Sequence, residues 1–172
     1  MPILLTALAV AIADGLFPII VNFNRLGWSA PRRVFQSVAA GVLGRPSFDG
    51  GVPTALLGVA LHCTIALIWT CIYVLIVRRL GIVQRLVRTT GGTILVGVIY
   101  GAMIWLSMDY VVIRLSRATF TPPSNPAFWQ QFIWHMVGVG QVIVWLTEKV
   151  FVRGARGATG ASSYGTRASS PA

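Results

Sequence analysis

The chain has 172 residues, enough for one domain, and hydrophobic residues make up 55% of it while charged residues make up 10%. Soluble domains carry about 25% charged residues, so the composition argues against an ordinary soluble protein. The 14 Lys and Arg exceed the 4 Asp and Glu, for a net charge of +10. These basic residues lie between long apolar runs, without a basic face of interleaved aromatics, which indicates contact with lipid headgroups and no nucleic-acid partner.

The first apolar segment covers about 3–24 and can span a bilayer, which takes about 20 residues. Ala11-Ile12-Ala13 has the small residues of a signal-peptide cleavage site. No Lys or Arg precedes it, however, and the apolar run continues past Asp14 to Phe23. A cleavable signal has a basic start and a short apolar core, so we expect an uncleaved first span.

A short amphipathic helix is predicted next, over about 31–44. Ser29 and Pro31 are typical of a helix start, while Gly44 and Pro46 end it. An apolar stripe at helical spacing lies between them: Val34, Phe35, Val38, Ala39, Val42 and Leu43. The polar residues of the other face are Arg32, Arg33, Gln36 and Ser37. About 14 residues reach only about 21 Å, short of the roughly 30 Å hydrocarbon core, so we expect this helix to lie in the membrane interface.

Three further apolar segments follow, at about 53–77, 90–113 and 128–152. Together with the first they predict an all-α fold, an integral membrane four-helix bundle with the interfacial helix between spans one and two. Residues 1–152 form this membrane domain. Residues 153–172 are rich in Gly, Ala and Ser with scattered Arg, which predicts a disordered basic tail.

The distribution of basic residues predicts the orientation of the four spans. The middle loop and the tail share a side with eight of them: Arg78, Arg79, Arg85, Arg88, Lys149, Arg153, Arg156 and Arg167. The other side has six: Arg25, Arg32, Arg33, Arg45, Arg114 and Arg117. Since cytoplasmic loops carry the excess of Lys and Arg, we expect both termini in the cytoplasm.

Four ionisable residues fall inside the predicted spans: Asp14, His62, Asp109 and His135. Such residues are rare and costly in a bilayer and mark candidate functional sites. At about 1.5 Å per residue, all four fall in the half nearer the 31–44 helix. Small residues at three-to-four spacing accompany them, as at Gly97 and Gly101, so we expect the four groups to converge where the helices pack closely.

The turn after the interfacial helix is the candidate lid of this cluster. Arg45, Asp49, Gly50 and Gly51 supply one basic group, one acidic group and a flexible connection. Because the second span begins immediately afterwards, we expect the turn to seat the helix over the polar half of the bundle. In the alternative interpretation, the interfacial helix has only a structural role, packed on the end of the bundle with its arginines among lipid headgroups.

Three functions remain open from these residues. The four groups could hold the bundle together as a structural or accessory membrane protein of unknown activity. They could instead form the pathway of a small-solute or proton transporter or channel subunit. His62 and His135 could also ligate one b-type haem. We expect no enzyme, since no Ser/His/Asp set, nucleotide loop or zinc spacing occurs, and no dedicated metal site or other cofactor. The expected partners are the lipid bilayer and either a second copy of the chain or another membrane protein.

Several runs also resemble a known family. They are RVFQSVAAGVLGR at 33–45, SFDGG at 47–51, LGVALH at 57–62 and MDYVV at 108–112. The pattern is similar to a family of small uncharacterised bacterial inner-membrane proteins with four predicted spans, over roughly residues 10–150. The resemblance implies location in the bacterial inner membrane and supplies no activity. Asn is common in the family where Asp109 stands, which argues against a mechanism that needs an acid there.

Overall fold

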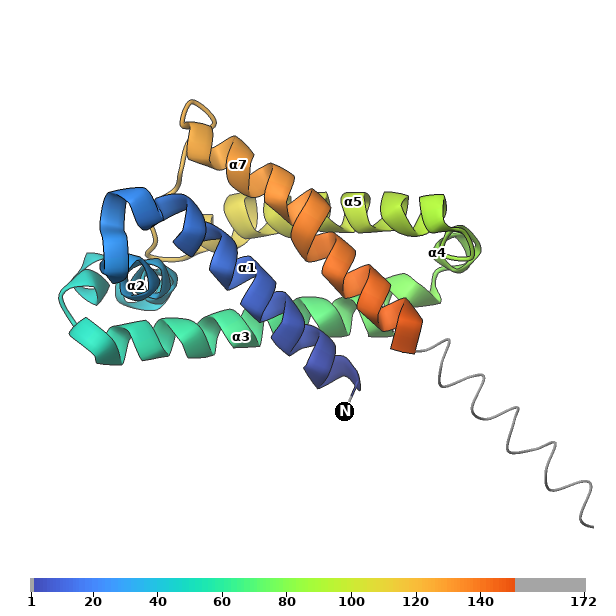
Figure 1. Ribbon diagram of the computed structural model, residues 1–172, viewed down its shortest axis with the longest axis horizontal. Helices are drawn as coiled ribbons and strands as arrows, with labels where there is room; N and C mark the ends of the chain where they lie inside the picture. Colours follow the sequence, from blue (N-terminus) through green and yellow to red (C-terminus); the bar gives the residue numbers. More distant parts are fainter. Residues whose placement is uncertain (1, 151–172) are drawn as a thin grey trace, which may run out of the picture.

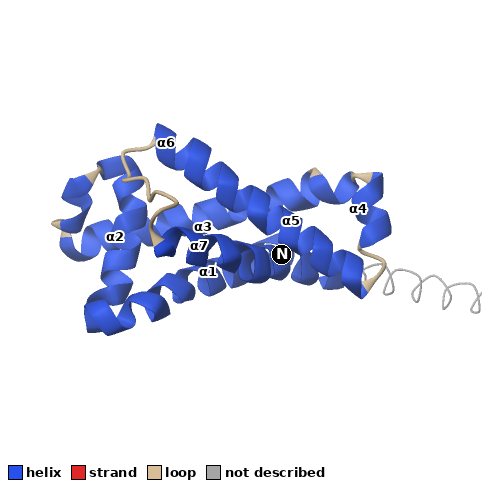
Figure 2. Ribbon diagram, turned by 90° about the horizontal axis from the view of Figure 1, so that it is seen from above, coloured by secondary structure: helices blue, strands red, loops and turns tan. Residues whose placement is uncertain are grey.

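The computed structural model describes residues 2–150, and every element in this part of the chain is a helix. Figure 2 shows helices joined by short loops and turns, without a strand among the described residues. The all-α prediction is therefore confirmed. The predicted basic tail at 153–172 lies outside the described residues.

Four long helices make up the body of the molecule (Figure 1). They are α1 (Pro2–Leu26), α3 (Gly51–Leu75), α5 (Thr90–Ser107) with its continuation through the π turn η4 (Met108–Val112) and α6 (Ile113–Leu115), and α7 (Pro126–Trp134) with its continuation through the π turn η5 (His135–Val139) to residue 150. Thr89 caps α5 by accepting a hydrogen bond from the Gly92 amide, at 3.1 Å. Asn125 caps α7 in the same way, with Pro126 directly behind it.

Three helical stretches are long and apolar enough to cross a membrane: Ile3–Leu43, Gly51–Arg79 and Thr90–Leu115. Large apolar side chains point outward from each, with Ile20 68%, Leu56 63% and Ile99 59% exposed. The helix at 126–150 is not among the three, although the sequence predicted a fourth span at 128–152. Its apolar run is interrupted by polar and charged side chains, namely Gln130, Gln131, His135, Gln141, Glu148 and Lys149.

The short helix α2 (Ala30–Leu43) lies where the sequence predicted an amphipathic helix. It follows α1 after the 3-10 turn η1 (Gly27–Ser29) and runs across the end of the long helices, so that Figure 1 shows it end-on. Its backbone packs closely on α3, because a Cβ at Gly58 would overlap the Phe35 carbonyl. The Gly41 carbonyl also accepts a hydrogen bond from the Arg117 amide at 3.0 Å, which joins α2 to the segment after α6.

One residue of α2 departs from the amphipathic prediction. Gln36 was expected on the solvent face beside the two arginines, but it is only 1% exposed. Its Nε2 donates to the Gly51 carbonyl at 2.9 Å and to the Thr54 hydroxyl at 3.2 Å. Gln36 is therefore buried because its amide fastens α2 to the start of α3.

The core lies between α3, α5 and the second half of the 126–150 helix. Its fully buried side chains include Tyr73, Ile143 and Val144. The Tyr100 hydroxyl donates to the Trp69 carbonyl at 2.5 Å, which links α5 to α3. At the end opposite α2, the chain turns through η3 (Val77–Arg79) and α4 (Gly81–Leu86) before α5 begins. The two ends of the bundle thus carry different short helices.

Candidate functional site

Three of the four predicted ionisable residues meet in the middle of the bundle. Asp14 comes from α1, His62 from α3, and His135 begins the π turn η5. The Asp14 Oδ2 atom lies 3.9 Å from His62 Nε2, and its Oδ1 atom lies 3.9 Å from His135 Nε2. The side chains are 22% exposed for the aspartate and 14% for each histidine. One carboxylate therefore lies between two imidazoles on two other helices.

Backbone carbonyls hold both imidazoles in place. His62 Nε2 lies 3.0 Å from the Ala11 carbonyl oxygen, and His135 Nδ1 lies 2.8 Å from the Gln131 carbonyl oxygen. A carbonyl oxygen only accepts, so these nitrogens carry the hydrogens. A neutral His135 then presents the lone pair of Nε2 to Asp14. The contact is attractive when a proton is added to one of these two groups.

Close helix contacts make this convergence geometrically feasible. A Cβ at Gly101 of α5 would overlap the His135 carbonyl oxygen, so this glycine faces another helix as predicted. A Cβ at Gly97 would lie 2.6 Å from the amide atoms of Gln141 on the same neighbouring helix. On the other side of the cluster, Phe17 stacks on Trp134 with ring centroids 4.5 Å apart.

Asp109 is close to the cluster but is not joined to it. It is 6% exposed on η4, and its Oδ2 atom has no hydrogen-bond partner among residues 2–150. Arg114 and His135 are the basic residues near enough to act on its carboxyl. No ion pair within 4.0 Å joins it to either histidine in this part of the chain. The structure therefore brings together three of the four predicted groups and leaves the fourth beside them.

The predicted lid lies away from the cluster. Arg45 and Asp49 are exposed, on and after the 3-10 turn η2 (Arg45–Phe48), and no contact joins them to the three clustered residues in the described chain. Gly50 and Gly51 lead directly into α3, where Thr54 donates to the Ser47 carbonyl at 2.6 Å. The turn is too far along α3 from His62, since eleven residues of helix span roughly 16 Å.

Phe35 of α2 takes the place that the sequence analysis gave to the turn. Its ring meets the His62 ring edge-on, with centroids 5.8 Å apart. Its tip also lies 3.3 Å from where a Cβ of Gly15 would be, next to Asp14 in sequence. The apolar stripe of the predicted helix contains Phe35, but helical spacing alone does not indicate that an apolar ring covers a polar cluster.

Both π turns coincide with candidate residues. Asp109 is the second residue of η4 and His135 the first of η5. A π turn inserts a residue into the i→i+4 pattern and often occurs at functional sites, because it redirects a side chain that a regular helix would aim elsewhere. Nothing in the local sequence predicted either turn.

The cluster does not fit a metal or a haem. Among the described residues, no three His, Cys, Asp or Glu side chains are placed to hold one metal ion. A bis-histidine haem needs two free imidazole nitrogens facing an open slot. Here both Nε2 atoms face the carboxylate of Asp14, and His62 Nε2 already donates to Ala11.

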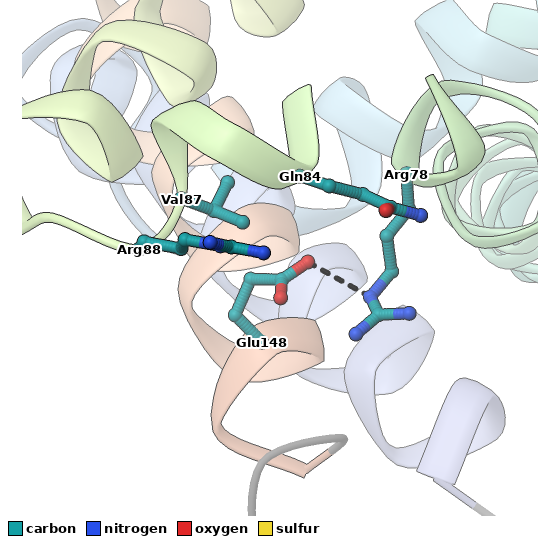
Figure 3. A pocket seen from close by; sticks show the side chains of 5 residues that line it. All are labelled: Arg78, Gln84, Val87, Arg88 and Glu148. Carbon is teal, nitrogen blue, oxygen red and sulfur yellow. Dashed lines mark hydrogen bonds and ion pairs between the residues drawn. The ribbon is translucent and has the colours of Figure 1, made fainter. Parts of the chain in front are cut away.

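A second polar cluster, which the sequence analysis missed, lies at the α4 end. Glu148 Oε1 accepts hydrogen bonds from Arg78 Nε at 2.9 Å and from the Tyr73 hydroxyl at 3.2 Å. These residues line or adjoin a cavity that Figure 3 shows from close by. Glu148 is 70 positions from Arg78 and 75 from Tyr73, so no local pattern could pair them.

Comparisons with protein-family models, with curated proteins and with solved structures found no match to this chain. The resemblance to four-span inner-membrane proteins therefore stays a prediction. What remains is the geometry itself, with one carboxylate 3.9 Å from each of two imidazoles.

Proposed function

We propose that this chain is a multi-pass protein of the bacterial inner membrane, with both termini in the cytoplasm and α2 in the opposite interface. Three apolar helical stretches with apolar outer faces support a membrane location. The orientation of α2 across their ends suits an interfacial helix (Figure 1). Trp28 and Trp129 are 92% and 51% exposed near this end, where an aromatic belt would place them.

The helix at 126–150 completes the bundle as a fourth span in this proposal. Several of its polar groups contact the other helices, which lowers the cost of a bilayer crossing. Gln141 Nε2 donates to the Ile94 carbonyl of α5 at 3.0 Å, and His135 faces Asp14. Among the exposed residues of this helix, Val137 and Ile133 are apolar, at 58% and 52%, while Gln130 and Lys149 are polar.

We further propose that Asp14, His62 and His135 form a proton-exchanging centre within the bilayer, as part of a pathway for protons or a proton-linked small solute. The observation that carries this is the placement of one carboxylate 3.9 Å from two imidazoles on two other helices. A charged carboxylate in hydrocarbon costs a few kcal/mol, and a shared proton removes that cost.

A structural role for the same groups is the second candidate, and one contact favours it. The bond between His62 and the Ala11 carbonyl ties α3 to α1 at 3.0 Å. Interhelical hydrogen bonds in membranes contribute roughly 0.6–2 kcal/mol each, enough to help fix the packing of the bundle. The two roles differ in what happens when the groups can still form hydrogen bonds but cannot titrate.

Proton flux into proteoliposomes separates the two roles. The full chain would be reconstituted with a trapped pH-sensitive dye, and an imposed potassium diffusion potential would drive protons inward. His62→Gln and Asp14→Asn keep much of the hydrogen-bonding capacity but cannot exchange protons near neutral pH. We expect the wild type to exceed empty liposomes and both variants to fall to their level. Asp49→Asn, which neutralises an exposed acid away from the cluster, is the matched control and should keep the wild-type rate.

The same preparation shows which solute, if any, moves with the protons. Candidate solutes would be added one at a time, and a proton-linked solute should accelerate the dye response in the wild type but not in His62→Gln. Folding of each variant is checked by its elution profile in detergent. A wild-type rate no greater than that of empty liposomes, with and without solutes, would leave only the structural role.

A further inference from the structure

The end of the bundle opposite α2 contains a cavity of about 430 Å³. It is lined by Arg78, Gln84, Val87, Arg88 and Glu148 (Figure 3). These residues come from η3, α4, the turn before α5 and the 126–150 helix, so four segments meet around one space. The cavity is separate from the Asp14 cluster and has no part in the proposed proton exchange.

One wall of the cavity is fixed and close to neutral in charge. Glu148 accepts from Arg78 Nε at 2.9 Å, and the buried Tyr73 hydroxyl donates to the same carboxylate oxygen at 3.2 Å. A carboxylate paired with a guanidinium and a phenol is held in one orientation. Glu148 therefore positions Arg78 and offsets its charge, which leaves Arg88 as the excess positive charge of the lining.

The other wall offers hydrogen-bond donors. Within residues 2–150, the Arg88 guanidinium and the Gln84 amide make no side-chain hydrogen bond or ion pair. Figure 3 shows both side chains extending into the space around Glu148, from different segments. A guanidinium and an amide that line one small cavity present several N–H groups to a single ligand. Guanidinium groups match the oxygens of carboxylate and phosphate especially well.

Apolar side chains beside the cavity indicate that its ligand has an apolar part. Ile76, Leu80 and Ile82 of the same connection are 60%, 51% and 68% exposed. Exposed arginines, Arg79 and Arg85, occur in the same segment. A short connection with isoleucine, leucine and arginine on its surface is typical of a segment at the level of lipid headgroups.

We propose that this cavity binds the phosphate group of an anionic phospholipid. The phosphate oxygens would accept hydrogen bonds from Arg88 and Gln84, and the acyl chains would lie along Ile76 and Ile82. A free phosphate ion presents the same oxygens, but it has no apolar part that could contact the exposed apolar side chains beside the cavity. This inference rests on the proposed membrane location and not on the proton-exchanging centre.

Lipid-dependent melting of the purified full chain tests the assignment. Melting in a neutral detergent would be followed against the mole fraction of a diacylglycerol phosphate, of the corresponding diacylglycerol, and against inorganic phosphate. A ligand that binds only the folded state raises the melting temperature in proportion to its occupancy. We expect stabilisation by the phospholipid alone. Arg88→Gln should raise the apparent dissociation constant by about tenfold, as expected for loss of a charge-assisted hydrogen bond.

Arg79→Gln is the matched control, because it removes the same charge from an exposed residue that does not line the cavity. We expect it to change the apparent constant by less than about threefold. Equal weakening by Arg79→Gln and Arg88→Gln would show that a diffuse basic surface, and not the cavity, binds the phospholipid. Equal stabilisation by inorganic phosphate would overturn the lipid as the ligand. If Arg88→Gln melts early without lipid, Gln84→Glu decides, since it keeps the size of the side chain but repels phosphate and must also weaken binding.

Discussion

Gly101 offers a sharp test of how the Asp14 cluster is assembled. It places α5 against η5, and a Cβ at this position would lie 2.6 Å from the His135 carbonyl carbon, 0.8 Å closer than the 3.4 Å at which ordinary contact begins. The neighbouring atoms are backbone, so the helices themselves must separate. A gap of about 0.5–1 Å forfeits a quarter to a half of the dispersion attraction across a contact. We therefore expect Gly101→Ala to cost about 1–3 kcal/mol of stability.

Thermal melting in detergent measures this cost, at about 2–4 °C per kcal/mol for a chain of this size. Gly91→Ala is the matched control, because it lies on the same helix and a Cβ there would meet nothing within 4 Å. We expect Gly91→Ala to melt at or slightly above the wild-type temperature. Equal melting of the two variants would refute the close contact between α5 and η5, and with it the packing that brings His135 to Asp14.

Two further predictions concern the orientation of the chain and the cover of the cluster. A C-terminal fluorescent-protein fusion should be bright and a C-terminal alkaline phosphatase fusion inactive, and the opposite pattern would reverse the proposed orientation. Phe35→Ala and His62→Gln should be non-additive in melting experiments, with a coupling of about 0.5–3 kcal/mol, because their rings touch. Asp49→Asn and His62→Gln should add within about 0.5 kcal/mol, and the reverse ranking of the two pairs would restore the turn as the lid.

The helices were predictable because their signals are local. Long apolar runs and a 3.6-residue stripe give α1, α2, α3 and α5 close to their observed bounds. The meeting of Asp14, His62 and His135 also followed from sequence, since small residues beside them indicated where helices approach closely. The fourth helix is less apolar than the others because of its Gln, His, Glu and Lys residues, and its length alone therefore predicted a span that its hydropathy does not support.

The features that were missed depend on contacts between distant residues or on backbone irregularity. Gln36 looks like a surface residue by periodicity, but its hydrogen bonds to the Gly51 carbonyl and the Thr54 hydroxyl hold it in a buried position. The two π turns change the direction of side chains without a sequence signature. Glu148 and Arg78 meet only where the fourth long helix packs beside the end of α3, and periodicity says nothing about such pairs.

The placement of Asp14 on the first helix has a consequence for biosynthesis. Ribosomes make α1 first, whereas His62 and His135 emerge much later in the chain. In the proposed membrane location, a nascent α1 enters the bilayer with an acid that has neither partner until α3 arrives, and the pairing is complete only with the last helix. A chain truncated before residue 135 would retain a half-satisfied carboxyl, a feature by which membrane quality control could distinguish unfinished copies from finished ones.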